Sequence, residues 1–203
     1  DPLRGPNRGM ALRQNIANAQ RGSAVLEMLR AEPRAGIADF GKAIQRCGQI
    51  FDRDSLTGVW NLARDRNLGF DLAAYGQLLA AAVCTIRFRE RISDDDKEWV
   101  SEFGKHVWSE MLQVGLVPCQ PQFGAALTLC AKTGATEWAF ELWAELRRRQ
   151  IPMNVVLYTQ YLISVAQQQD GEGWAAVEDE LSCMAQCGLK PDHVLLGALL
   201  NIA

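Results

Sequence analysis

Few residues in this chain have the types and spacing that catalysis or metal binding requires. The 203 residues include two isolated histidines, His106 and His193, and six cysteines with no Cys-x-x-Cys pair. Zinc sites need clustered Cys and His ligands, and the sequence contains no G-x-S-x-G, P-loop or H-E-x-x-H motif. The sequence therefore predicts a protein that is not an enzyme, that uses no metal and no cofactor, and whose thiols are free and reduced.

The distribution of charge limits the partners. Residues 1–50 carry eight Lys and Arg against four Asp and Glu, whereas residues 151–203 carry one against six. The net charge of −3 excludes a uniformly basic surface, so a polyanion would have to bind in a local groove. The Arg-rich residues 1–22 are predicted to be a basic N-terminal arm, which either docks on an acidic or nucleic-acid surface or is a loose terminus.

The elements that position these residues are predicted to be helices. Apolar residues recur at helical spacing in stretches of about 10 to 16 residues, separated by Gly and Pro. The segment Trp138–Arg149 is typical, because Trp138, Leu142, Trp143 and Leu146 form one apolar stripe. No apolar run approaches the roughly 20 residues that a membrane span needs. The chain is therefore predicted to be all-α and not membrane-spanning.

Similar segments recur about every 35 residues, which indicates a repeat protein. The predicted repeats are 37–71, 72–119, 120–154 and 155–192, followed by a partial unit at 193–203. Each repeat is predicted to be a helical hairpin that buries its apolar face by stacking on its neighbours, which gives a right-handed α-solenoid over residues 23–203. Trp60, Trp108 and Trp143 occupy the same place in their repeats and are predicted to be core residues.

The second repeat is longer than the others because of an insertion near residues 84–98. Its first half is rich in Arg, and a partner contact is predicted for Arg87, Phe88, Arg89 and Arg91, with a solvated loop or helix extension as the alternative. In its second half, Ser93 and Asp96 predict a capping box, which places acidic residues at the positive start of the next helix.

The repeat length, the aromatic residue near the start of each first helix and the connector Gly188–Asp192 resemble pentatricopeptide repeats. The resemblance covers about four-fifths of the chain, and segment 129–143 is also close to the family's pattern. It implies an α-solenoid that binds single-stranded RNA in a mitochondrion or chloroplast, with typically one base recognised per repeat. In that family, the residue after the aromatic and the last residue of the repeat contact the base.

The resemblance also implies particular binding residues. Thr159 with Asp192 matches a pair that the family uses, usually for guanine, and Asn154 and Asp71 are last residues of other repeats. Lys132 matches a lysine that approaches the RNA backbone.

Glycine at the other base-contacting positions supports an alternative to RNA binding. Gly41, Gly76 and Gly124 have no side chain to hydrogen-bond a base, and the apolar segment 193–203 starts a hairpin that either further chain or another protein would complete. A protein-binding structural subunit of a larger organellar complex, such as a mitochondrial ribosome or a membrane-associated assembly, would need no base recognition. The predicted partners are thus single-stranded RNA, protein subunits of an organellar assembly or both, with no small-molecule substrate.

Overall fold

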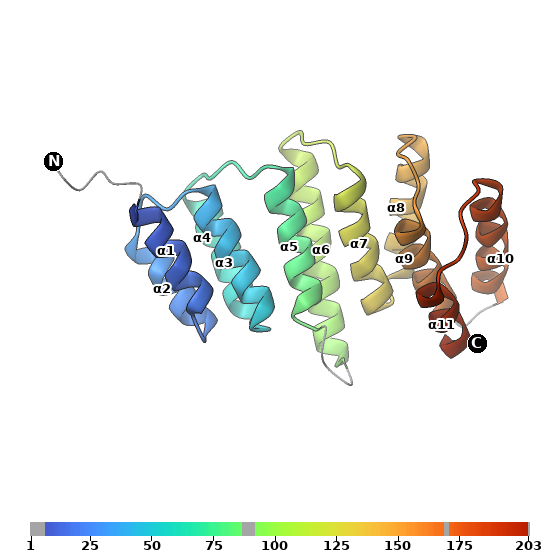
Figure 1. The fold of residues 1–203 in the computed structure, drawn as a ribbon, viewed down its shortest axis with the longest axis horizontal. Helices are drawn as coiled ribbons and strands as arrows, with labels where there is room; N and C mark the ends of the chain where they lie inside the picture. The colour runs from blue at the N-terminus through green and yellow to red at the C-terminus, as the bar shows by residue number, and fades with distance from the viewer. Residues whose placement is uncertain (1–6, 87–91, 169–170, 203) are drawn as a thin grey trace. The chain divides into compact units, whose positions relative to one another are not determined.

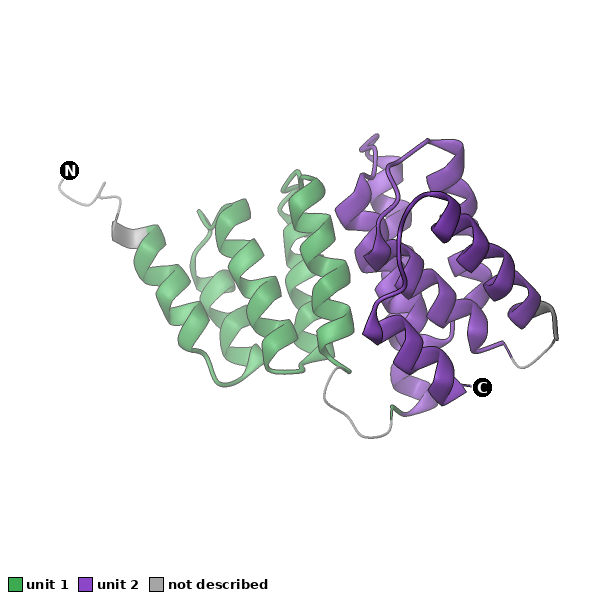
Figure 2. Cartoon of the chain, turned by 45° about the vertical axis from the view of Figure 1, so that its right-hand side comes forward, with its two compact units in different colours: residues 1–92 green, residues 93–203 purple. Residues whose placement is uncertain are grey.

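The computed structural model describes residues 7–86, 92–168 and 171–202, and these form eleven helices and no strand. The chain divides into two compact units, residues 1–92 and residues 93–203, which we describe separately (Figure 2). The first unit contains α1 (Asn7–Asn18), α2 (Gly22–Ala31), α3 (Ile37–Gln49), α4 (Arg53–Asp65) and α5 (Leu72–Cys84). The second contains α6 (Asp94–Gln113), α7 (Gln120–Thr133), α8 (Thr136–Arg148), α9 (Val155–Ala166), α10 (Gly171–Gln186) and α11 (His193–Ile202).

The first unit has two layers of helices. Helices α1, α3 and α5 pack side by side in one layer, and α2 packs against α4 in the other (Figure 1). The apolar stripes of the two layers meet in a core that includes Leu29, Phe40, Ile44 and Leu56, all with no exposed surface. The first layer therefore has an outer face that carries the polar residues of α1, α3 and α5.

The described part of residues 1–22 differs from the predicted arm. Residues 7–18 form α1, which packs against α2 and α3, and Ile16 is completely buried. The Arg46 side chain of α3 donates a 2.7 Å hydrogen bond to the Ala19 carbonyl, which fixes the end of this helix. The high Arg content hid a helix that packs through only a few apolar residues, with Ile16 buried and Met10 63% exposed.

The second unit repeats this arrangement. Helices α7, α9 and α11 form one layer, while α6, α8 and α10 each pack against the helices of that layer. The Trp143 ring of α8 is 3% exposed and stacks on Tyr161 of α9, with ring centroids 4.2 Å apart. Its indole nitrogen donates a 3.0 Å hydrogen bond to Glu180 of α10, which joins α8 to α10. The other repeated tryptophans, Trp60 and Trp108, are also buried.

The connectors that end the repeats act as N-caps. The side chains of Asp71, Asn154 and Asp192 accept hydrogen bonds of 2.8 to 2.9 Å from backbone N–H groups in the first turns of α5, α9 and α11. The first residue of each predicted repeat is accordingly the first residue of a helix. The Pro-Asp type of connector thus has a local physical cause, since Asp and Asn are strong N-cap residues.

The predicted second repeat is divided between the units, with α5 in the first and α6 in the second. Arg87, Phe88, Arg89 and Arg91 lie outside the described residues. Helix α6 has 20 residues, against 13 in α4 and in α8, so the C-terminal part of the insertion lengthens this helix. At its start, the Ser93 side chain accepts a hydrogen bond from the Asp96 N–H and donates a 2.7 Å bond to the Asp96 carboxylate.

Candidate nucleic-acid interface

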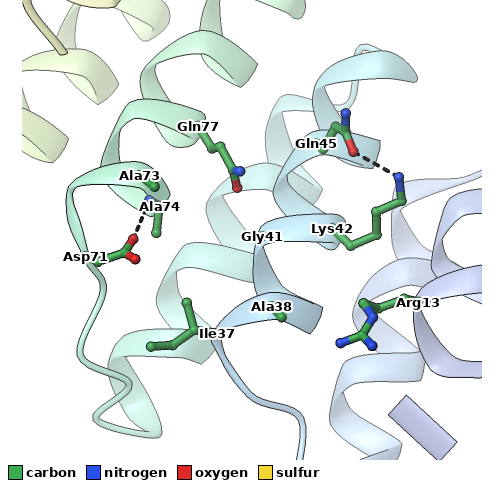
Figure 3. Close-up of a pocket in the computed structure, with 10 residues that line it drawn as sticks. All are labelled: Arg13, Ile37, Ala38, Gly41, Lys42, Gln45, Asp71, Ala73, Ala74 and Gln77. Carbon is green, nitrogen blue, oxygen red and sulfur yellow. Dashed lines mark hydrogen bonds between the residues drawn. The ribbon is translucent and has the colours of Figure 1, made fainter. Parts of the chain in front are cut away.

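A groove of about 570 Å³ lies on the outer face of α1, α3 and α5 in the first unit (Figure 3). Its floor is formed by Ile37, Gly41 and the alanines of α3 and α5. Polar side chains surround this floor: Arg13 from α1, Lys42 and Gln45 from α3, and Asp71 and Gln77 from α5 and its N-cap. The groove therefore combines a shallow apolar floor with cations, amides and one carboxylate.

The two cations of the groove differ in their partners. Arg13 lies 3.4 Å from the carboxylate of Asp39, a residue only 8% exposed that also accepts the Gly36 N–H at 3.0 Å. Lys42 donates a 2.9 Å hydrogen bond to the Gln45 side-chain oxygen, and no carboxylate pairs with it among the described residues (Figure 3). Lys42 is therefore a cation that a ligand phosphate could approach without first displacing an acidic partner.

Of the sequence-predicted RNA-binding residues, Asp71 lies in this groove. One oxygen of its carboxylate accepts the Ala74 N–H at 2.8 Å and so caps α5 (Figure 3). Asn154 and Asp192 have the same capping role in the second unit. Each of these residues thus has a structural task in addition to any contact with a ligand.

Thr159 is not presented to a ligand. Its side chain is 2% exposed, and its buried hydroxyl has no hydrogen-bond partner among the residues that the structure describes. By contrast, the buried Ser164 on the same helix donates a 2.8 Å hydrogen bond to the Gln160 carbonyl. A base could contact the Thr159 hydroxyl only if the packing around α9 opened.

Lys132 is exposed near the end of α7 in the second unit and so does not contribute to the groove of the first unit. Sequence reasoning did not identify Arg13, Lys42, Gln45 or Gln77 as groove residues. A usable signal exists for two of them, because Lys42 and Gln77 each directly follow the glycine at the base-contacting position of their repeats.

Other kinds of site find no support in the described part of the chain. No group of three or more His, Cys, Asp or Glu residues is arranged there to hold a metal ion. None of the described helices is both long and apolar enough to cross a bilayer. The six cysteines are all free, with Cys47 and Cys130 buried and Cys119 and Cys187 exposed.

Comparison with solved structures identifies the fold. The crystal structure of the pentatricopeptide repeat protein PPR10 from maize matches 96% of the chain with a TM-score of 0.72 and 17% sequence identity. The chain has the pentatricopeptide-repeat fold. The all-α solenoid of stacked helical hairpins predicted from the sequence is thereby confirmed. The chain spans about a quarter of the PPR10 chain, since the match covers 27% of that protein.

Two further pentatricopeptide-repeat structures contain RNA. PPR10 in complex with an 18-nt psaJ RNA element matches 94% of this chain and 26% of its own, with a TM-score of 0.67 and 17% identity. The PPR domain of Arabidopsis thaliana protein-only RNase P 1, in complex with tRNA, matches 84% of this chain and 80% of its own, with a TM-score of 0.63 and 17% identity. No protein-family model and no curated protein matches the sequence.

Proposed function

We propose that this chain is a non-enzymatic module that binds single-stranded RNA along the outer face of α1, α3 and α5. One observation carries the proposal: the groove on this face brings the pentatricopeptide base-contacting positions Gly41 and Asp71 together with the cation Lys42. The solved structures of PPR10 and of the RNase P 1 domain, which contain RNA, support it.

The chemistry of the groove suits an unstacked strand. The apolar floor can accept base faces, whereas the amides and the second oxygen of Asp71 offer hydrogen bonds to base edges. Lys42 can neutralise a phosphate of the RNA. Lys132 in the second unit can do the same, because no carboxylate among the described residues pairs with it. With so few cations and a net charge of −3, affinity should fall steeply once these contacts are lost.

The test is fluorescence anisotropy of the full chain with a labelled, randomised single-stranded RNA pool at 50 mM and 150 mM salt. We expect binding by the unmodified chain and weaker binding by Lys42→Ala. Because each phosphate contact on a single strand contributes about 0.7 to the slope of log K against log salt, that slope should become shallower by about this amount.

The matched control is Lys105→Ala, which removes an exposed lysine that is paired with Glu102 on α6. It should leave both the affinity and the salt slope unchanged. Absence of RNA binding at 50 mM salt, or the same loss in both variants, would contradict the proposed function.

A specific observation on α11 favours protein binding as a second candidate function. Leu196 and Leu200 occupy the repeat positions that hold Tyr158 and Leu162 in α9. Tyr158 and Leu162 are at most 2% exposed, whereas Leu196 and Leu200 are 51% and 79% exposed. We infer that this exposed apolar face of α11 accepts an amphipathic helix of a protein partner.

This second candidate is tested by sedimentation velocity over a range of protein concentrations. If this face of α11 binds protein, the isolated chain should self-associate, and Leu200→Glu should abolish that self-association. The control Val114→Glu, at a residue 59% exposed elsewhere in the same unit, should leave self-association intact. A monomer at every concentration would count against protein binding by α11.

The proposal places the module in a mitochondrion or chloroplast, in agreement with the family that the sequence resembles. It also assigns to Arg87, Phe88, Arg89 and Arg91 a contact with RNA or with a protein subunit of an organellar assembly. Import of a fluorescent fusion into isolated organelles tests the location.

A further inference from the structure

The space beside Gly41 is occupied by a side chain from the next helix of its layer. A Cβ atom built on Gly41 would lie 2.9 Å from the side-chain oxygen of Gln77, closer than carbon atoms of real side chains come. Gln77 belongs to α5, which packs directly against α3 (Figure 3). The Gln77 amide therefore lies where a side chain of residue 41 would project.

Backbone geometry does not explain the glycine. Gly41 lies inside α3 and has no positive φ, so an alanine could adopt the same backbone conformation. Glycine inside a helix is unfavourable relative to alanine. What Gly41 provides is room, and the described group that uses this room is the Gln77 amide.

The Gln77 amide is available to a ligand. Its side chain is exposed and has no hydrogen-bond partner among the described residues. The other polar groups of the groove are engaged: Arg13 with Asp39, Lys42 with Gln45, and one oxygen of Asp71 with the Ala74 N–H. Gln77 thus offers both a hydrogen-bond donor and an acceptor, and a ligand can bind to them without breaking an existing side-chain hydrogen bond.

We propose that Gln77 recognises an RNA base in this groove, in place of the side chain that residue 41 lacks. This inference rests on the proposed function. An amide presents a donor and an acceptor side by side and can form two hydrogen bonds with the edge of one base. The second oxygen of Asp71, at the N-terminal end of the same helix, can accept a further hydrogen bond from the base.

The corresponding glycine of the second unit has a different neighbour. A Cβ on Gly124 would have the Leu157 side chain 3.8 Å away as its nearest neighbour, and no amide lies within contact distance. Gln160, which occupies the place in its repeat that Gln77 occupies in the second, does not approach Gly124. Of these two glycines, only Gly41 has a neighbouring amide in the place of the missing side chain, and Gln160 provides a matched control.

The experiment is selection from a randomised single-stranded RNA pool with the full chain, followed by sequencing of the bound fraction. The unmodified chain should enrich one base at one position. We expect Gln77→Ala to reduce that enrichment by about tenfold, which is the discrimination typical of one bidentate amide–base pair. Gln160→Ala should leave it unchanged.

Gly41→Ala provides a second, independent variant. The atom that the new Cβ meets is the far end of a flexible side chain, so the amide is displaced while α3 remains intact. We expect the same loss of base preference as in Gln77→Ala, with unchanged far-ultraviolet circular dichroism. RNA binding with an unaltered base preference in both variants would overturn the role of Gln77 and leave the proposed function standing. No RNA binding by the unmodified chain would overturn both.

Discussion

The buried hydroxyl of Thr159 gives the most discriminating prediction. This residue is 2% exposed, and its Oγ1 atom has no hydrogen-bond partner in the described part of the chain. Valine has nearly the same shape and the same branching at Cβ, so Thr159→Val changes the hydroxyl and little else. The substitution removes a polar group that was taken out of water without compensation.

The expected gain follows from the cost of burying such a group. An unsatisfied buried donor or acceptor costs about 1 to 3 kcal/mol. We therefore expect Thr159→Val to raise the free energy of unfolding of the second unit by about 1 kcal/mol or more. With an m-value of about 2 kcal/mol per molar, the urea midpoint should rise by about 0.5 M.

The assay is urea unfolding followed by tryptophan fluorescence, with Thr128→Val as the control. The Thr128 hydroxyl donates a 2.7 Å hydrogen bond to the Gly124 carbonyl, so its removal should not stabilise the protein. A lower midpoint for Thr159→Val would refute the reasoning, because it would show that the hydroxyl has a partner in the folded chain.

The same variant separates packing from base recognition. If Thr159 remains buried when RNA binds, Thr159→Val leaves RNA affinity and base preference unchanged. A loss of preference for one base would show that the hydroxyl reaches RNA, as the resemblance to pentatricopeptide repeats implies for this position.

Two further predictions concern buried groups. Burial raises the pKa of the Cys47 and Cys130 thiols from 9.0 to about 12. Both thiols should therefore resist alkylation until the chain unfolds, whereas the exposed thiols should react at once. Between pH 9 and pH 12 the folded chain then binds more protons than the unfolded chain, and the urea midpoint should fall as the pH rises through this range. Glu180→Ala should lower the free energy of unfolding by about 2 kcal/mol, because the buried Trp143 indole loses its acceptor and the Arg147 guanidinium loses the carboxylate that lies 2.6 Å from it. The exposed Glu178→Ala should change the urea midpoint little.

The periodic elements could be predicted from the sequence because the repeat encodes them locally. The capping residues Asp71, Asn154 and Asp192 end one repeat and start the next helix, so the beginning of α5, α9 and α11 follows from a few neighbouring residues. The sequence marks helix α1 only weakly, because few of its residues are apolar and the burial of Ile16 depends on tertiary packing.

The groove could not be predicted in the same way, because it depends on which side chain fills a space that another residue leaves. The absence of a side chain at Gly41 is visible in the sequence, but the arrival of Gln77 from the next helix of the layer is not. Conversely, Thr159 matches the base-contacting pattern of the family, yet tertiary packing buries its hydroxyl.

These observations together change how glycine at the base-contacting position should be interpreted. A glycine that only deleted a base contact would leave an open surface. At Gly41 a neighbouring amide fills the space, and at Gly124 an apolar side chain approaches it. The same residue type therefore has two different surroundings at these positions, and base recognition by each repeat has to be judged from the helix next to the glycine as well as from the glycine itself.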